Sequence, residues 1–207
     1  AIENAIAQTV LACTEMSKTR TGVLIVFERE INLDEMARTG TIVDAQVSSE
    51  LLKNIFFVKA AMHDGAVIIR DMRIYAASCV LPSTASDMDF GSMGTRHRAA
   101  VGVTEVSDAL VIVVSEQTGI VSVAQDGKLL RGVDRKTLTD ILMTYLAGSR
   151  YLRVKRLEER AEQIKSATAA TSATTATEPK PTDASAQEPD STPEGERAGK
   201  KEEDAER

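Results

Sequence analysis

The sequence has 207 residues, of which 43% are apolar and 27% charged, and its formal net charge at pH 7 is −6. This length allows one well-packed domain and an additional segment, and the apolar content is typical of globular proteins. Ten acidic and five basic residues follow position 166, which leaves the rest of the chain with a net charge near −1. A nearly neutral domain has no overall field for duplex nucleic acid, so we expect no nucleic-acid partner and argue against a DNA-associated scaffold.

The first predicted element is an amphipathic helix over residues 2–18, whose apolar side chains recur at helical spacing (Ile2, Ile6, Val10, Cys13 and Met16). A buried strand follows in "TGVLIVFERE", entered through Gly22. Its apolar run is too short to cross a bilayer, and no signal-peptide pattern precedes it. Short helices are predicted over residues 33–39 and 48–56, the second opened by a serine cap with Glu50 in its first turn.

The segment "MHDGAVIIR" places His63, Asp64, Gly65 and Ala66 directly before a predicted strand. An Asp-Gly pair is common turn chemistry, so a structural role is the simpler interpretation of the pair alone. His63 and Asp64, adjacent at the strand entrance, can also share one divalent metal ion, or one of them can bind metal while the other accepts a proton from a substrate hydroxyl. Residues 65–83 then form a predicted hairpin that turns around 70–73 and ends at Pro82.

The segment "GTRHR" brings three kinds of donor together at the start of another predicted helix. Gly94 allows close backbone approach, Thr95 adds a hydroxyl, and Arg96 and Arg98 add forked cationic groups around His97. The free N–H groups of the first helical turn also favour an anion. The pattern fits a polyphosphate better than a carboxylate, with a solvated basic turn as the alternative.

Residues 109–133 are predicted to form three strands, with turns at 117–119 and 126–127. Ser115 and Glu116 end the first of these strands, which alone is ordinary turn chemistry. Leu81 can contact a base, although a leucine before a strand-ending proline is more often part of a core. The chain has only two histidines, His63 and His97, and both lie in the motifs described above.

A long helix is predicted over residues 137–165, apolar on one face and heavily charged after position 150. Residues 166–207 hold four of the five prolines and no large apolar side chain, so we expect a disordered acidic tail. Cys13 and Cys79 lie in apolar contexts and are predicted to be reduced, buried thiols, which makes a cytoplasmic location the default. The predicted fold class is α/β, with a central mixed β-sheet flanked by helices. The predicted organisation is a connector helix over 1–20, a catalytic domain over 21–165 and the tail over 166–207.

The paired motifs "DGA" and "GTRHRAA", followed by "EVSDALVIVVSEQTG", closely resemble the diadenylate cyclase (DisA-N, or DAC) domain over residues 1–160. An N-terminal helix that leads directly into the domain resembles the membrane-bound CdaA type. The resemblance implies synthesis of cyclic di-AMP from two ATP, with release of two pyrophosphates, by a homodimer whose two active sites meet face to face.

Residue roles follow from the same resemblance. Asp64 would position or activate the ribose 3′-hydroxyl, and Leu81 would pack against adenine. The nucleotide pocket would be shaped by Gly65 and Ala66 and the triphosphate held by the 94–98 segment and Ser115 (Gly94, Thr95, Arg96, His97, Arg98). His63 and Glu116 would bind Mn²⁺ or Mg²⁺; the family often has a second acid at the next position, where this sequence has Gln117.

The family also implies tethering to the cell membrane by an N-terminal segment absent from this chain. A membrane-bound regulator and phosphoglucosamine mutase are the partners expected by analogy. The alternative function is a non-catalytic sensor that binds ATP or cyclic di-AMP, and Asp64 argues against it because a pure binder needs no acid beside the 3′-hydroxyl.

Overall fold

The computed structural model describes residues 2–85, 93–148, 157 and 160–165. The chain divides into two compact units, Ala1–Ala161 and Glu162–Arg207. In the second unit residues 162–165 are helical, and the predicted tail lies outside the described residues. The predicted boundaries after residues 20 and 165 stay predictions.

A seven-stranded mixed sheet forms the centre of this unit, as the sequence predicted, in the order β2-β4-β3-β1-β5-β6-β7. Only β1 and β3 are parallel; every other neighbouring pair is antiparallel. The strands are β1 Val23–Phe27, β2 Thr41–Gln46, β3 Ala66–Arg70, β4 Arg73–Cys79, β5 Leu110–Val114, β6 Val121–Gln125 and β7 Lys128–Arg131.

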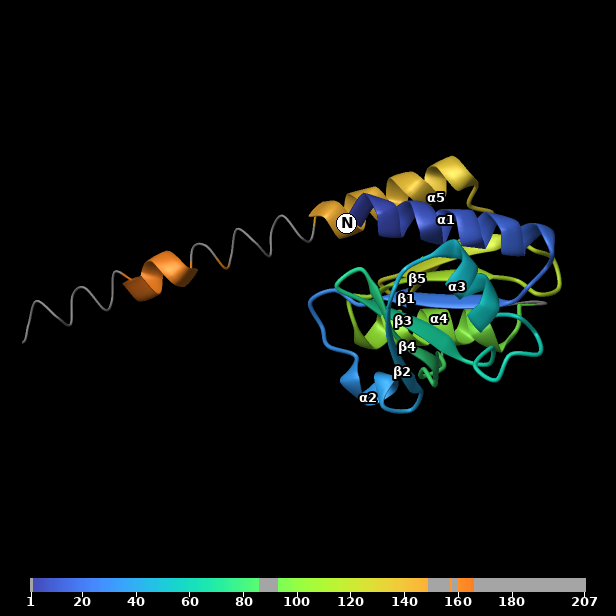
Figure 1. Cartoon of the computed structure of the whole chain (residues 1–207), viewed down its shortest axis with the longest axis horizontal. Coiled ribbons are helices and arrows are strands. Elements are labelled where there is room, and N and C mark those ends of the chain that lie inside the picture. Colours follow the sequence, from blue (N-terminus) through green and yellow to red (C-terminus); the bar gives the residue numbers. More distant parts are fainter. Residues whose placement is uncertain (1, 86–92, 149–156, 158–159, 166–207) are drawn as a thin grey trace, which may run out of the picture. The chain divides into compact units, whose positions relative to one another are not determined.

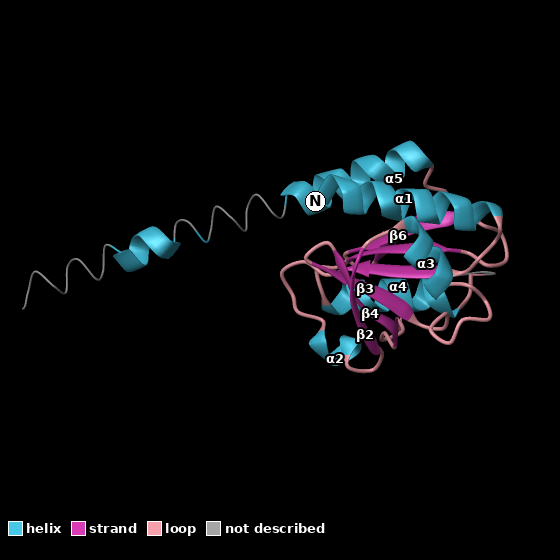
Figure 2. Ribbon diagram, viewed as in Figure 1, coloured by secondary structure: helices cyan, strands magenta, loops and turns pink. Residues whose placement is uncertain are grey.

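Helices cover both faces of the sheet. Figures 1 and 2 show α1 and α5 side by side along one face, where α3 also packs. The opposite face is covered by α4 and the short α2. Their bounds are α1 Ile2–Lys18, α2 Asp34–Ala37, α3 Ser49–Ile55, α4 Thr95–Val106 and α5 Arg135–Leu142, which continues as the π-helical turn η1 Met143–Ala147.

The strand β1 shows why the core has two halves. All five of its residues are buried, and alternate side chains point to opposite faces of the sheet. Val23, Ile25 and Phe27 pack under α1, α3 and α5, whereas Leu24 and Val26 pack against α2 and α4. A strand covered on both faces therefore has the continuous apolar run that the sequence displays.

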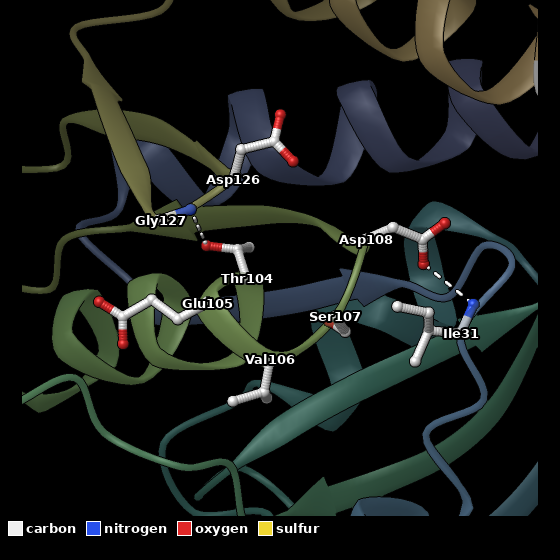
Figure 3. A pocket seen from close by; sticks show the side chains of 8 residues that line it. All are labelled: Ile31, Thr104, Glu105, Val106, Ser107, Asp108, Asp126 and Gly127. Atoms are coloured by element: carbon white, nitrogen blue, oxygen red, sulfur yellow. Dashed lines mark hydrogen bonds between the residues drawn. The ribbon is translucent and has the colours of Figure 1, made fainter.

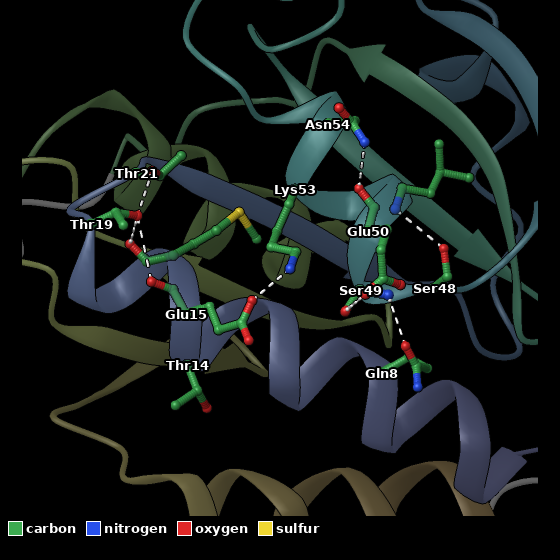
Figure 4. Close-up of polar contacts among 12 residues, drawn as sticks. Gln8, Thr14, Glu15, Thr19, Thr21, Ser48, Ser49, Glu50, Lys53 and Asn54 are labelled. Carbon is green, nitrogen blue, oxygen red and sulfur yellow. Dashed lines mark hydrogen bonds and ion pairs between the residues drawn. The ribbon is translucent and has the colours of Figure 1, made fainter.

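The predicted connector helix is part of this core. In α1 the side chains of Ile6, Val10 and Cys13 are buried against the sheet. Figure 4 shows the polar contacts that join α1 to α3: the Gln8 side chain accepts a hydrogen bond from the Ser49 N–H (2.9 Å), and Lys53 pairs with Glu15 at 2.6 Å.

Both cysteines are buried free thiols, as predicted. Burial raises the pKa of Cys13 to about 12 and that of Cys79 to about 11. The thiols are therefore protonated at neutral pH and behave as small apolar side chains.

Two elements differ from the sequence prediction. The edge strand β2 was not predicted, because its side chains are mostly exposed and its register shifts between Ile42 and Ala45. The long helix predicted from residue 137 begins at Arg135, after an Asp134 cap whose carboxylate accepts from the Thr137 N–H (2.7 Å). Its predicted segments at 149–156 and 158–159 lie outside the described residues.

Candidate functional site

A pocket of about 310 Å³ opens where the chain entering β3 and the chain leaving β4 meet the first turn of α4. A concave site with a few convergent polar groups is the usual form of a small-molecule site. Its lining residues come from all three segments and from β1 (Leu24, Asp64, Gly65, Ser78, Cys79, Val80, Leu81, Ser83, Thr95, Arg96 and Ala99).

Gly65 is required by the backbone at this pocket. Its φ is +98°, a conformation that L side chains rarely adopt, and an added Cβ would come within 2.8 Å of the Cys79 carbonyl oxygen. The Ser78 hydroxyl donates to the Asp64 carbonyl at 2.7 Å. The loop before β3 is therefore fixed against the end of β4, and this fixes where Asp64 lies.

Asp64 and His63 are adjacent in the sequence, but only Asp64 lines the pocket. Asp64 is exposed and lines the pocket, so its carboxylate is accessible to a ligand. His63 does not line it; its ring is half-buried, with Nδ1 2.7 Å from the Ala60 carbonyl oxygen. Since a carbonyl only accepts, Nδ1 carries a proton, and Nε2 is the nitrogen that can offer a lone pair.

The N-terminus of α4 is open to a ligand. Gly94 is its N-cap residue in an extended conformation, and among the described residues no side chain caps the helix. Thr95, the first helical residue, is exposed and lines the pocket. Free N–H groups and the positive end of the helix dipole together favour an anion here.

Arg96 is held in place by an acid from another strand end. Its Nη1 donates to Glu116 Oε2 at 2.7 Å, and its side chain is 20% exposed whereas that of Glu116 is 62% exposed. Arg96 lines both the main pocket and a small pocket of about 30 Å³ beside Ser115 and Glu116. This single guanidinium thus links the two parts of the site.

His97 and Arg98 point away from the main pocket. His97 is 4% exposed and lines the small pocket. Burial, and to a smaller extent the charge of Arg131, lowers the pKa of His97, so the ring is neutral at pH 7. Arg98 is exposed, lines neither pocket, and its carbonyl accepts from the Thr84 N–H at 3.1 Å.

Ser115 organises the turn after β5. Its Oγ accepts from the backbone N–H groups of Gln117 (3.3 Å) and Thr118 (3.2 Å). The hydroxyl hydrogen remains available for a ligand, because a hydroxyl both accepts and donates. Ser115 can therefore stabilise the turn and contact a phosphate at the same time.

Leu81 and Ala66 belong to the same half of the core, but only Leu81 lines the pocket. Leu81 is 9% exposed and lines the main pocket, so it combines core packing with an apolar surface for a ligand. Ala66 is fully buried in β3 and packs in the core beneath α4. It lines neither pocket.

The structure thus places five of the predicted site residues around one pocket: Asp64, Gly65, Leu81, Thr95 and Arg96. A second group surrounds the small pocket: Gly94, Thr95, Arg96, His97, Ser115 and Glu116. Neither pocket is lined by His63, Ala66 or Arg98. The sequence analysis did not predict Ser78 or Ser83 at the site. Ser78 lies near the end of β4 and Ser83 directly follows Pro82, and neither belongs to a motif.

The residues predicted to bind metal can be tested against this geometry. Among the described residues, no three His, Cys, Asp or Glu side chains gather as a metal-binding group. Mg²⁺ commonly takes only one or two protein ligands and completes its shell with water and substrate phosphates, so a small donor set fits it. The hydrogen bond from His63 Nδ1 to a backbone carbonyl is also typical of a histidine that binds metal through Nε2.

A larger pocket of about 630 Å³ lies at the other end of α4 (Figure 3). Three acids line it, Glu105, Asp108 and Asp126, and no lysine or arginine does. The Asp108 carboxylate already accepts from the N–H groups of Glu30 and Ile31, both at 3.0 Å. The larger pocket therefore has the wrong charge for a polyphosphate, whereas the pocket of about 310 Å³ has Arg96 and the first turn of α4 in its lining and is the candidate site.

Comparisons with known proteins show which family the chain is similar to. The family model described as DisA bacterial checkpoint controller nucleotide-binding matches residues 10–129. Cyclic di-AMP synthase CdaA of Bacillus subtilis is 45% identical over 145 residues, which cover 68% of this chain and 53% of that protein. Diadenylate cyclase of Listeria monocytogenes is 44% identical over 131 residues, covering 63% of this chain and 48% of that protein.

Among solved structures, a double mutant of DacA from Staphylococcus aureus is similar with a TM-score of 0.68 and 43% identity. The match covers 69% of this chain and 95% of that one. The chain spans about half the length of the curated relatives it matches.

Proposed function

This chain belongs to the family of DisA bacterial checkpoint controller nucleotide-binding domains, and from that membership we propose that it is a diadenylate cyclase. The proposed reaction joins two ATP molecules into cyclic di-AMP and releases two pyrophosphates. Names of relatives at 44–45% identity support this proposal.

The observation that carries the proposal is the pocket between β4 and α4, which combines an accessible acid, an apolar wall and a cationic helix N-terminus. In our proposal adenine packs against Leu81, and the ribose 3′-hydroxyl lies beside Asp64. The triphosphate extends toward Thr95, Arg96 and the free N–H groups of α4.

The proposed reaction requires an in-line displacement at the α-phosphorus of ATP. The Asp64 carboxylate orients the 3′-hydroxyl of one ATP and accepts its proton, and the 3′-oxygen forms a bond to the α-phosphorus of the other ATP. The bond from that phosphorus to the bridging oxygen breaks, and pyrophosphate leaves with the electron pair. Arg96 and the N–H groups of α4 stabilise the negative charge on the phosphoryl oxygens.

Two such displacements close the ring, so two nucleotides must face each other. One protomer supplies one pocket, at the lower end of the size range for small-molecule sites. We therefore propose a symmetric homodimer in which the two pockets meet face to face and each protomer orients the 3′-hydroxyl that attacks its partner's ATP.

Nucleotidyl transfer of this kind generally needs a divalent cation, which neutralises phosphate charge and helps pyrophosphate leave. We propose that His63, through Nε2, and Glu116 are the residues that would hold Mn²⁺ or Mg²⁺. Glu116 accepts from Arg96 through Oε2, so in the nucleotide complex the same carboxylate would serve both the guanidinium and the metal ion.

Among the helices that the structure describes, none is long and apolar enough to span a membrane. Tethering to the cell membrane by a further N-terminal segment remains a proposal drawn from the family. We also propose, from the family, that a membrane-bound regulator and phosphoglucosamine mutase control the enzyme.

The test is incubation of the purified chain with ATP and either Mn²⁺ or Mg²⁺, with the products separated by chromatography and identified by mass. We expect cyclic di-AMP and pyrophosphate. Asp64→Asn should reduce the rate by at least about 100-fold, the usual contribution of a general base, while binding of 3′-deoxy-ATP is kept.

Asp126→Asn is the matched control, since Asp126 lies in the larger pocket at the far end of α4 and should leave the rate unchanged. ATP that is bound but never converted by the wild-type chain would support the sensor function instead. Unchanged turnover in Asp64→Asn would remove Asp64 from the mechanism.

A further inference from the structure

Gly22 lies beside the candidate site without belonging to any motif. It directly precedes β1, and the register pairs Val23 with Val114, so Gly22 lies next to the turn that carries Ser115 and Glu116. Gly22 is buried. Its φ is outside the left-handed region, so the backbone alone would accept any L residue here.

What excludes a side chain at Gly22 is the site itself. A Cβ at this position would be 2.8 Å from Arg96 Nη1, 2.9 Å from Arg96 Cζ and 3.0 Å from Glu116 Oε2. These three atoms are its nearest neighbours, and all belong to the ends of side chains. A methyl group here would therefore displace the guanidinium and the carboxylate rather than the backbone.

The position of Arg96 also depends on little else. Its Nη1 donates to Glu116, and among the described residues its buried Nε has no hydrogen-bond partner. A guanidinium with few fixed partners takes the position that the packing around it allows. The missing side chain at Gly22 provides that space.

We propose that Gly22 is a positioning residue for the nucleotide site, which sets ATP affinity by leaving room for the Arg96 guanidinium against Glu116. This inference rests on the proposed function, since it assumes that Arg96 binds the triphosphate. Gly22 itself touches neither nucleotide nor metal.

The test is a double-mutant cycle of Gly22→Ala and Arg96→Ala, with binding of 3′-deoxy-ATP in Mg²⁺ measured by calorimetry. This probe lacks the attacking hydroxyl, so binding is separated from turnover. We expect Gly22→Ala to weaken binding by about tenfold, as for loss of one hydrogen bond to a charged group. In the Arg96→Ala background the same substitution should change affinity by less than about twofold, because the crowded group is gone.

Gly148→Ala is the control variant, since a Cβ there meets nothing within 4 Å in the part of the chain that the structure describes, and it should leave affinity unchanged. An unchanged affinity in Gly22→Ala, or an equal loss with and without Arg96, would overturn the inference. If Gly22→Ala alone unfolds, the double variant decides: recovery of the fold supports a clash with Arg96, and continued unfolding refutes it.

The outcomes for the inference and for the proposed function can be told apart. A wild-type chain that binds the probe but makes no cyclic di-AMP refutes the cyclase function and leaves the cycle to decide the role of Gly22. A wild-type chain that does not bind the probe overturns both.

Discussion

Of the three consecutive side chains Arg96, His97 and Arg98, only the middle one is buried. Successive residues on a helix point about 100° apart, so one turn can send a side chain inward between two that face outward. The sequence predicted one continuous basic cluster. In the structure the ring of His97 is neutral, and the positive charge comes from the two arginines.

The buried ring predicts how stability depends on pH. Burial lowers the pKa of His97 in the folded state, so the unfolded chain takes up a proton first as the pH falls through about 6.5. We therefore expect the free energy of unfolding to decrease below that pH, and this contribution to be absent in His97→Gln. Urea unfolding midpoints at about pH 7.5 and about pH 5.5 measure the slope on either side of the ordinary histidine pKa.

Equal slopes in the wild type and His97→Gln would contradict the assignment to His97.

The residues of the site could be predicted from the sequence only where they belong to a recognisable motif. Asp64, Thr95 and Arg96 stand in short motifs with mixed chemistry, and the structure gathers them around one pocket. Ser78 and Gly22 carry no such pattern, because each acts through a neighbour distant in sequence: Ser78 through the Asp64 carbonyl and Gly22 through Arg96. Contacts of this kind exist only once the strands are paired.

At the scale of elements, no side chain of the described residues caps the start of α4. Gly94 has φ −79° and ψ −173°, which any residue adopts, and a Cβ there meets no atom of the described residues within 4 Å. Serine is a better N-cap than glycine by a few tenths of a kcal/mol. We therefore expect Gly94→Ser to be at least as stable as the wild type in thermal unfolding.

The same substitution should weaken binding of 3′-deoxy-ATP by roughly tenfold, since the serine oxygen would occupy the N–H groups that the phosphates need. Calorimetry with the folded variant measures this loss. Undiminished binding would mean that the N-terminus of α4 does not hold the triphosphate.

The helix α1 was predicted as a connector, yet its apolar stripe completes the core. Ile6 is 1% exposed and packs in the half of the core under α1, α3 and α5. We expect Ile6→Ala to lower the free energy of unfolding by about 2–5 kcal/mol, the cost of emptying a buried site of this size. Urea denaturation measures it, and the exposed Glu3→Ala should change stability by less than about 0.5 kcal/mol.

Elements with a strong period were the predictable part of the fold. The stripe on α1, the buried β1 and the paired strands β5 to β7 follow directly from apolar spacing and turn residues. The strand β2 has mostly exposed side chains and Asp44 at φ +44°, so nothing local marks it as a strand. Its pairing with β4 is a tertiary contact that local spacing does not encode.

At the scale of the whole molecule, the proposed reaction makes two protomers depend on each other. Each Asp64 would assist the formation of one of the two bonds between a 3′-oxygen and an α-phosphorus. A dimer of one wild-type and one Asp64→Asn protomer can therefore form one of these bonds but not the other. Such a mixed dimer should convert two ATP into a linear dinucleotide that keeps one triphosphate, with release of one pyrophosphate. The ring then stays open.

Mixing the wild type with increasing amounts of Asp64→Asn at constant total protein tests this dependence. If protomers exchange freely, dimers with two intact sites decrease as the square of the wild-type fraction, to about one quarter at equal amounts. Cyclic di-AMP should fall along that curve while the linear product appears in the mass spectrum. Dilution with Asp126→Asn should leave both products unchanged, and a linear decrease of cyclic di-AMP would show that each protomer completes the reaction independently.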